Sequence, residues 1–191
     1  MDVLTRLASP SAYLAVPVFV LAFVTIALFF RAGEPFGTIN DFFDAIALLL
    51  LVPPVLALQG RAGEDAGGWL GPLTALTALG LVVAAVGQFL LIARIIDLNG
   101  SYITGGIGIL PFLVWVMAIV WLSFGRQLLP APLGWSAAAL IGCIVLLSIF
   151  ASLKLDIAVW AGAALLMAAL LAWLIALAAA VSVQRAAGLP A

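Results

Sequence analysis

The chain has 191 residues, of which 67% are hydrophobic and only 8% are charged, and its seven basic and eight acidic side chains nearly cancel. A soluble domain averages about 45–50% apolar and about 25% charged residues, so this composition indicates an integral membrane protein. The few cations form no basic run, which argues against nucleic acid as a partner. Because the sequence has no histidine and only one cysteine, Cys143, the usual haem, zinc and copper sites cannot be built. We therefore expect no bound cofactor and no metal.

Six apolar stretches are long enough to cross about 30 Å of hydrocarbon, which takes about 20 helical residues. They are apolar on every side, whereas the strands of a β-barrel alternate apolar and polar residues. The connections are short and rich in glycine, proline and charge, so consecutive helices must be antiparallel neighbours. The sequence predicts an all-α, polytopic membrane protein that forms one domain over residues 1–191, a compact bundle of six transmembrane helices near 12–30, 39–58, 69–96, 107–124, 133–153 and 157–183.

An even number of helices places both termini on the same side of the membrane. That side carries four of the seven cations and the opposite side carries three, a balance that favours cytoplasmic termini. The expected location is the inner membrane of a bacterial cell, in which the lipid bilayer is the principal partner.

The second span opens with TINDFFDAIALLLLVPP, residues 38–54, which places two carboxylates one helical turn apart. Thr38 followed by Asp41 predicts a variant capping box at the helix start. Asp44 lies about 4.5 Å deeper along the axis and has no dedicated local partner in the sequence. Two interpretations of Asp44 stay open: a solvated or paired carboxylate at the membrane interface, or the floor of a polar cavity with a cation as counter-ion.

The side opposite the termini is the more polar one, and it supplies a candidate polar site. Gln88, the only amide deep in the third span, is expected to form an interhelical hydrogen bond rather than to bind a ligand. Pro53 and Pro54 predict a kink in the second span, a feature that exposes backbone groups to substrate in some transporters. The counter-ion of the cavity interpretation is Arg94 or Lys154, and the complete candidate set is Asp44, Asp41, Asn40, Arg94, Asp97, Gln88 and Lys154.

Small residues recur every four positions along the last span. Such a ladder makes one helix face flat and permits close contact with a neighbouring helix, either inside the bundle or in another subunit. The candidate packing face is Ala164, Ala168, Ala172, Ala176 and Ala180.

Catalytic patterns are not found: the sequence has no Ser–His or Cys–His set, no HExxH and no phosphate-binding glycine loop. The segments TINDFFDAIALLLLVPPVLAL, GGIGILPFLVW and GRQLLPAPLGW resemble parts of small multi-pass bacterial membrane proteins grouped as domains of unknown function. That resemblance implies a compact helical membrane domain and transfers no catalytic or binding residue.

Three functions follow, in order of preference. The first is a non-catalytic structural or accessory subunit that packs against a membrane-protein partner or in a homo-oligomer. The second is a carrier or binder of a small apolar or cationic molecule, or of an ion, through the polar side around Asp44. The third is an intramembrane enzyme, and we expect the protein not to be one.

Overall fold

Backbone N–H and C=O groups find no water inside a bilayer, so a spanning segment must pair them within itself, as a helix does. The computed structural model describes residues 3–62 and 64–186, and in these residues six α-helices account for nearly the whole chain. Each contains a stretch of at least 22 residues that is long and apolar enough to cross a membrane, which confirms the all-α membrane fold. The helices are α1 Val3–Ala32, α2 Phe36–Ala62, α3 Leu70–Ile92, α4 Leu98–Phe124, α5 Ala131–Ser152 and α6 Asp156–Ala186, and a short 3-10 helix, η1 Glu64–Ala66, precedes α3.

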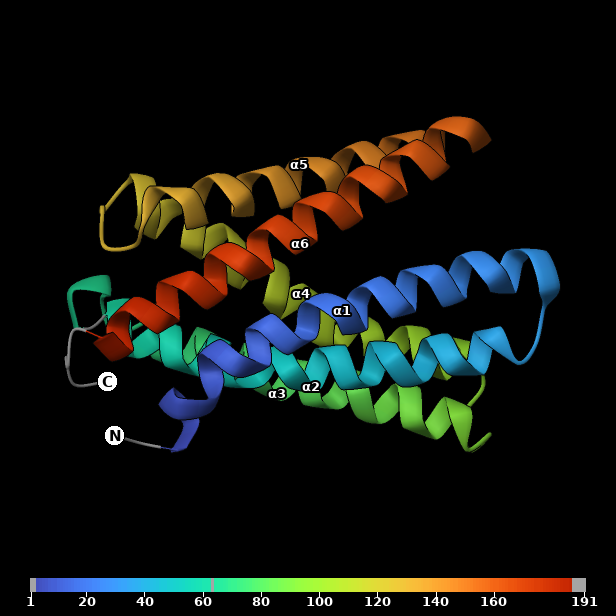
Figure 1. Cartoon of the computed structure of the whole chain (residues 1–191), viewed down its shortest axis with the longest axis horizontal. Helices are drawn as coiled ribbons and strands as arrows, with labels where there is room; N and C mark the ends of the chain where they lie inside the picture. The colour runs from blue at the N-terminus through green and yellow to red at the C-terminus, as the bar shows by residue number, and fades with distance from the viewer. Residues whose placement is uncertain (1–2, 63, 187–191) are drawn as a thin grey trace.

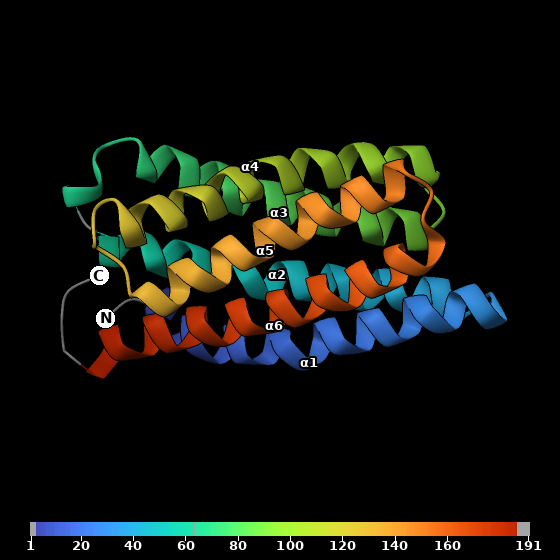
Figure 2. The same ribbon diagram turned by 90° about the horizontal axis from the view of Figure 1, so that it is seen from above.

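The six helices form an up-and-down bundle (Figures 1 and 2). Each helix packs against the next one in the chain, and α6 returns to α1, so the contacts close into a ring. A smaller contact joins α2 and α6. The helix α1 begins and α6 ends at one end of the bundle, which we call the termini end (Figure 2). At the opposite end, which we call the far end, α2, α4 and α6 begin.

The core is tightest in the middle and at the termini end. Phe112 and Trp115 of α4 and Trp173 of α6 meet with ring centroids 5.5 to 6.4 Å apart, and both tryptophans are fully buried. The buried side chains of α5 all lie in its first half, and from residue 141 to residue 155 none is buried. Figure 1 shows α5 and α6 diverging from α1 and α2 toward the far end. The α5–α6 hairpin therefore projects from the bundle there.

Glycines bring α3 and α4 into close contact. A Cβ atom added to Gly108 would overlap the carbonyl oxygen of Gly80 and would lie 2.6 Å from the Cβ of Ala84. One turn further, the Thr77 hydroxyl donates a hydrogen bond to the carbonyl of Pro111 at 3.1 Å. Small residues on α3 and α4 thus let the two helices pack backbone against backbone.

The first, third and fourth spans have different bounds from those expected. The first, α1, begins at Val3, nine residues before the expected start. The third ends at Ile92 rather than near residue 96, because Arg94 turns the chain with a left-handed φ of 56° and its N–H bonds to the carbonyl of Leu91. The fourth begins at Leu98, nine residues before the expected start, because the Asp97 carboxylate accepts a hydrogen bond from the N–H of Gly100 at 2.8 Å and caps the helix.

Candidate functional site

The start of α2 is capped by a different residue from the one expected. The helix begins at Phe36, so Thr38 already lies in its first turn. The carboxylate of Glu34 accepts hydrogen bonds from the Thr38 backbone N–H at 3.3 Å and from its hydroxyl at 3.1 Å. The predicted capping box of Thr38 and Asp41 is therefore wrong, and Glu34 satisfies the free backbone donor instead.

Asp44 has a partner within its own helix. The side-chain amide of Asn40 donates a hydrogen bond to Oδ2 of Asp44 at 3.1 Å, and Asn40 is only 8% exposed. These residues are four positions apart, so they share a face of α2, and Leu51 and Leu58 on that face belong to the core. The half-buried Asp44 therefore points along the inward side of the helix, and the expectation that it lacks a local partner is wrong.

The cations of the candidate set stay at the surface. Arg94 and Lys154 follow the ends of α3 and α5, each in a left-handed turn, and both side chains are exposed. Asp97 is also exposed and caps α4. Among the side chains that the structure describes, Asp44 is paired with Asn40, and neither Arg94 nor Lys154 forms an ion pair with it. The pair at the start of α2 is thus a neutral amide bonded to a carboxylate.

Gln88 of α3 lies at the same end of the bundle. The rings of Phe42 in α2 and Phe89 in α3 meet with centroids 6.3 Å apart, which places these parts of the two helices side by side. The Oε1 atom of Gln88 is buried and accepts no hydrogen bond from any described residue. The interhelical hydrogen bond expected of Gln88 is thus not made through this atom, and the far end holds an unused acceptor beside the helix that carries Asp44.

Pro53 and Pro54 lie inside a continuous α2, nine or more residues from Asp44. At 1.5 Å per residue the two features are about 14 Å apart along the axis. Pro54 is buried and Pro53 is half-buried. The prolines and the Asp44 pair are therefore separate features, and the expected kink stays a prediction.

The alanine ladder of α6 divides into two halves. Ala180 is buried near the termini end and Ala176 is half-buried, whereas Ala164, Ala168 and Ala172 are exposed. The division follows from the spacing, because a step of four residues turns about 40° around the helix axis and Ala164 therefore lies about 160° from Ala180. The ladder thus packs inside the bundle at one end and presents a flat small-residue face outward along the rest.

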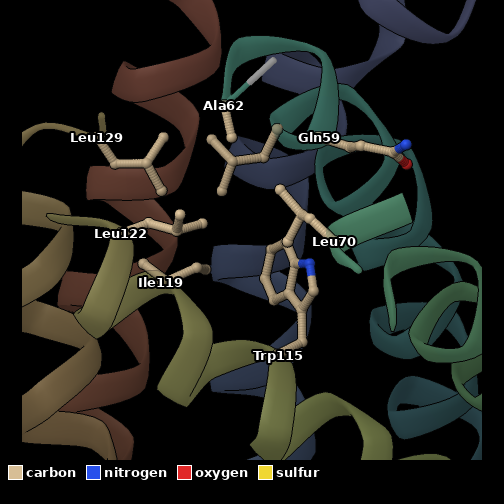
Figure 3. A pocket seen from close by; sticks show the side chains of 8 residues that line it. Gln59, Ala62, Leu70, Trp115, Ile119, Leu122 and Leu129 are labelled. Atoms are coloured by element: carbon tan, nitrogen blue, oxygen red, sulfur yellow. The ribbon is translucent and has the colours of Figure 1, made fainter. Parts of the chain in front are cut away.

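A small internal pocket lies near the termini end of the bundle (Figure 3). Its volume is about 10 Å³, which is room for one water molecule at most, and the residues around it are almost all apolar. Gln59 supplies the only amide, and its side chain points away from the pocket. Among the side chains that the structure describes, no group of three is arranged to hold a metal ion. The residues around the pocket are Leu58, Gln59, Ala62, Leu70, Trp115, Ile119, Leu122 and Leu129.

Comparisons of the chain with family models, with curated proteins and with solved structures find no match.

Proposed function

We propose that this chain is a non-catalytic structural subunit of a membrane assembly. It packs against another transmembrane helix through the outer half of α6, by which we mean the exposed row of Ala164, Ala168 and Ala172. The observation that carries the proposal is the exposure of Ala164, Ala168 and Ala172 in one row. We assign the subunit to a bacterial inner membrane with cytoplasmic termini, as the distribution of the cations favours.

Small residues on a transmembrane helix allow the backbone of another helix to approach closely. Lipid tails are as apolar as leucine, so helices associate there through close packing rather than through a hydrophobic drive. The same helix shows this use within the bundle, where Gly162 of α6 lies against Leu147 and Phe150 of α5. The row of Ala164, Ala168 and Ala172 also consists of small residues, and it is exposed.

The partner that fits this face best is α6 of a second copy of the chain. A two-fold axis places the same patch of each subunit opposite itself, and a flat ladder of alanines is complementary to its own image. The segment from Val159 to Ser182 contains no charged residue, so two copies meet without electrostatic repulsion.

Disulfide cross-linking in liposomes tests the proposal. In a Cys143→Ser background, Ala168→Cys is expected to give a cross-linked dimer on mild oxidation. Leu110→Cys is the matched control, because Leu110 is 66% exposed near the middle of α4 and lies away from the ladder. Equal cross-linking at both positions would reflect random collision and would refute pairing through α6.

A second candidate function is the binding of a small apolar cation at the Asp44 pair. It is favoured by a carboxylate on the inward side of α2 and by Gln88 Oε1 at the same end of the bundle, an acceptor that has no partner among the described residues. The test is binding of tetraphenylphosphonium, an apolar cation, to the purified protein. Asp44→Asn keeps the acceptor for Asn40 and should abolish binding, whereas Asp41→Asn should not. No binding to the unmodified protein, or equal loss in both variants, would exclude this function.

A further inference from the structure

A shallow apolar groove of about 580 Å³ lies on the outer surface between α3 and α4. It is at the termini end, because Trp69 immediately precedes α3 and Trp121 is in the last turn of α4. Its volume falls in the range of small-molecule sites, about 300–1,000 Å³. The lining residues are Trp69, Leu73, Val114, Met117, Ala118 and Trp121.

A cation is fixed at the mouth of this groove. The guanidinium carbon of Arg126 lies 5.1 Å from the centroid of the Trp121 ring, and the Trp69 ring meets Trp121 edge-on with centroids 5.8 Å apart. Gly125 leaves room for this arrangement, because a Cβ there would lie 3.1 Å from the Trp121 ring. The exposed Arg126 forms no ion pair with any described carboxylate, including Asp65 of η1 at the same end.

The direction of the groove is that of a lipid acyl chain. Val114, Met117 and Trp121 lie on successive turns of α4, so the groove extends about 10 Å along the helix and hence across the leaflet. Trp69 and Trp121 mark the level of the interface, where tryptophans gather, and Arg126 lies one turn further out, toward the headgroups.

We propose that this groove binds one phospholipid with an anionic headgroup, with an acyl chain along α4 and the phosphate on Arg126. The planar guanidinium donates two parallel hydrogen bonds to a phosphate, and stacking on Trp121 holds it in a fixed orientation. A zwitterionic lipid carries its own cation beside the phosphate, so the positive charge of Arg126 favours the anionic lipid. The groove is on α3 and α4, and the proposal does not depend on pairing through α6.

Native mass spectrometry of the purified protein with phosphatidylglycerol or phosphatidylcholine of identical acyl chains tests the proposal. We expect Arg126→Gln to weaken binding of the first phosphatidylglycerol about five- to tenfold, since one cation near anionic lipid contributes about 1 kcal/mol. Arg94→Gln removes an equally exposed cation at the far end, away from the groove, and should leave this affinity unchanged. Val114→Trp fills the groove and should weaken both lipids.

Three results would overturn the proposal. Equal losses in the two arginine variants would show attraction by net charge alone. Equal affinity for the two lipids, with no effect of Arg126→Gln, would show an ordinary annular lipid. Displacement of the lipid by millimolar inorganic phosphate would show an anion site that does not use the groove.

Discussion

The Gly108→Ala substitution probes a close approach of α3 and α4. The new Cβ would overlap the Gly80 carbonyl oxygen and would lie 2.6 Å from the Ala84 Cβ, whereas carbon atoms in contact are ordinarily about 3.5–4.0 Å apart. Neither neighbour is the end of a flexible side chain. The helices α3 and α4 must therefore separate by about 1 Å, which also strains the hydrogen bond from Thr77 to the Pro111 carbonyl.

Two opposing terms set the size of the effect. Overpacking a close contact costs about 1–3 kcal/mol, while replacing a helical glycine by alanine regains about 0.5–1 kcal/mol. The net expectation for Gly108→Ala is a loss in the free energy of unfolding that lies within about 0–2.5 kcal/mol and is centred on about 1 kcal/mol. Gly106 is the matched control on the same helix, because no atom lies within 4 Å of a Cβ added there. Gly106→Ala should therefore stabilise the protein by about 0.5–1 kcal/mol.

Thermal unfolding in detergent, followed by the reaction of Cys143 with a thiol-specific dye, measures both variants. Cys143 is half-buried on α5, so its reactivity rises when the bundle opens. The unfolding midpoint should fall by a few degrees for Gly108→Ala and should rise for Gly106→Ala. A midpoint for Gly108→Ala equal to or above that of Gly106→Ala would refute the inference of a backbone contact at this position.

Two further substitutions test individual hydrogen bonds. Trp115→Phe removes the 3.2 Å hydrogen bond from the indole N–H to the Thr74 hydroxyl. Trp173→Phe removes a buried N–H that has no partner among the described residues. In the same melting assay the first substitution should therefore destabilise the protein by about 1–2 kcal/mol more than the second. Asp97→Ala removes the cap of α4 and should lower the stability of the first turn of that helix by about 1 kcal/mol. Faster hydrogen exchange at the Gly100 amide would report this loss. An exchange rate equal to that of the unmodified protein would exclude the cap.

The number and type of the helices were predictable because their lengths and apolar composition leave a bilayer no other solution. The bounds of α4 were not, because the glycines and Ser101 after Asp97 are typical of a turn. In the bundle α3 packs against Gly108 of this segment, and the Thr104 side chain lies where a Cβ of Gly87 would be. Tertiary packing therefore overrides the local turn signal here.

The candidate site was predictable only in part. The spacing of Asn40 and Asp44 is a sequence signal for their hydrogen bond, and it was overlooked. The inward direction of Asp44 was not predictable, since α2 is apolar on all sides and has no polar face to mark which side meets solvent. The division of the ladder between Ala172 and Ala180 was predictable from helix geometry, since each four-residue step turns about 40° and the row winds from the exposed to the buried side of α6.

The central claim is that the outer half of α6 is a helix-pairing face, and its most direct test is the number of copies in one assembly. Single-molecule photobleaching of the labelled chain in nanodiscs large enough for two copies is expected to show two bleaching steps. Ala168→Phe, which places a bulky ring on the exposed ladder, should give one step while the melting midpoint is retained. A single step for the unmodified chain, or two steps that persist in Ala168→Phe, would contradict the proposed pairing.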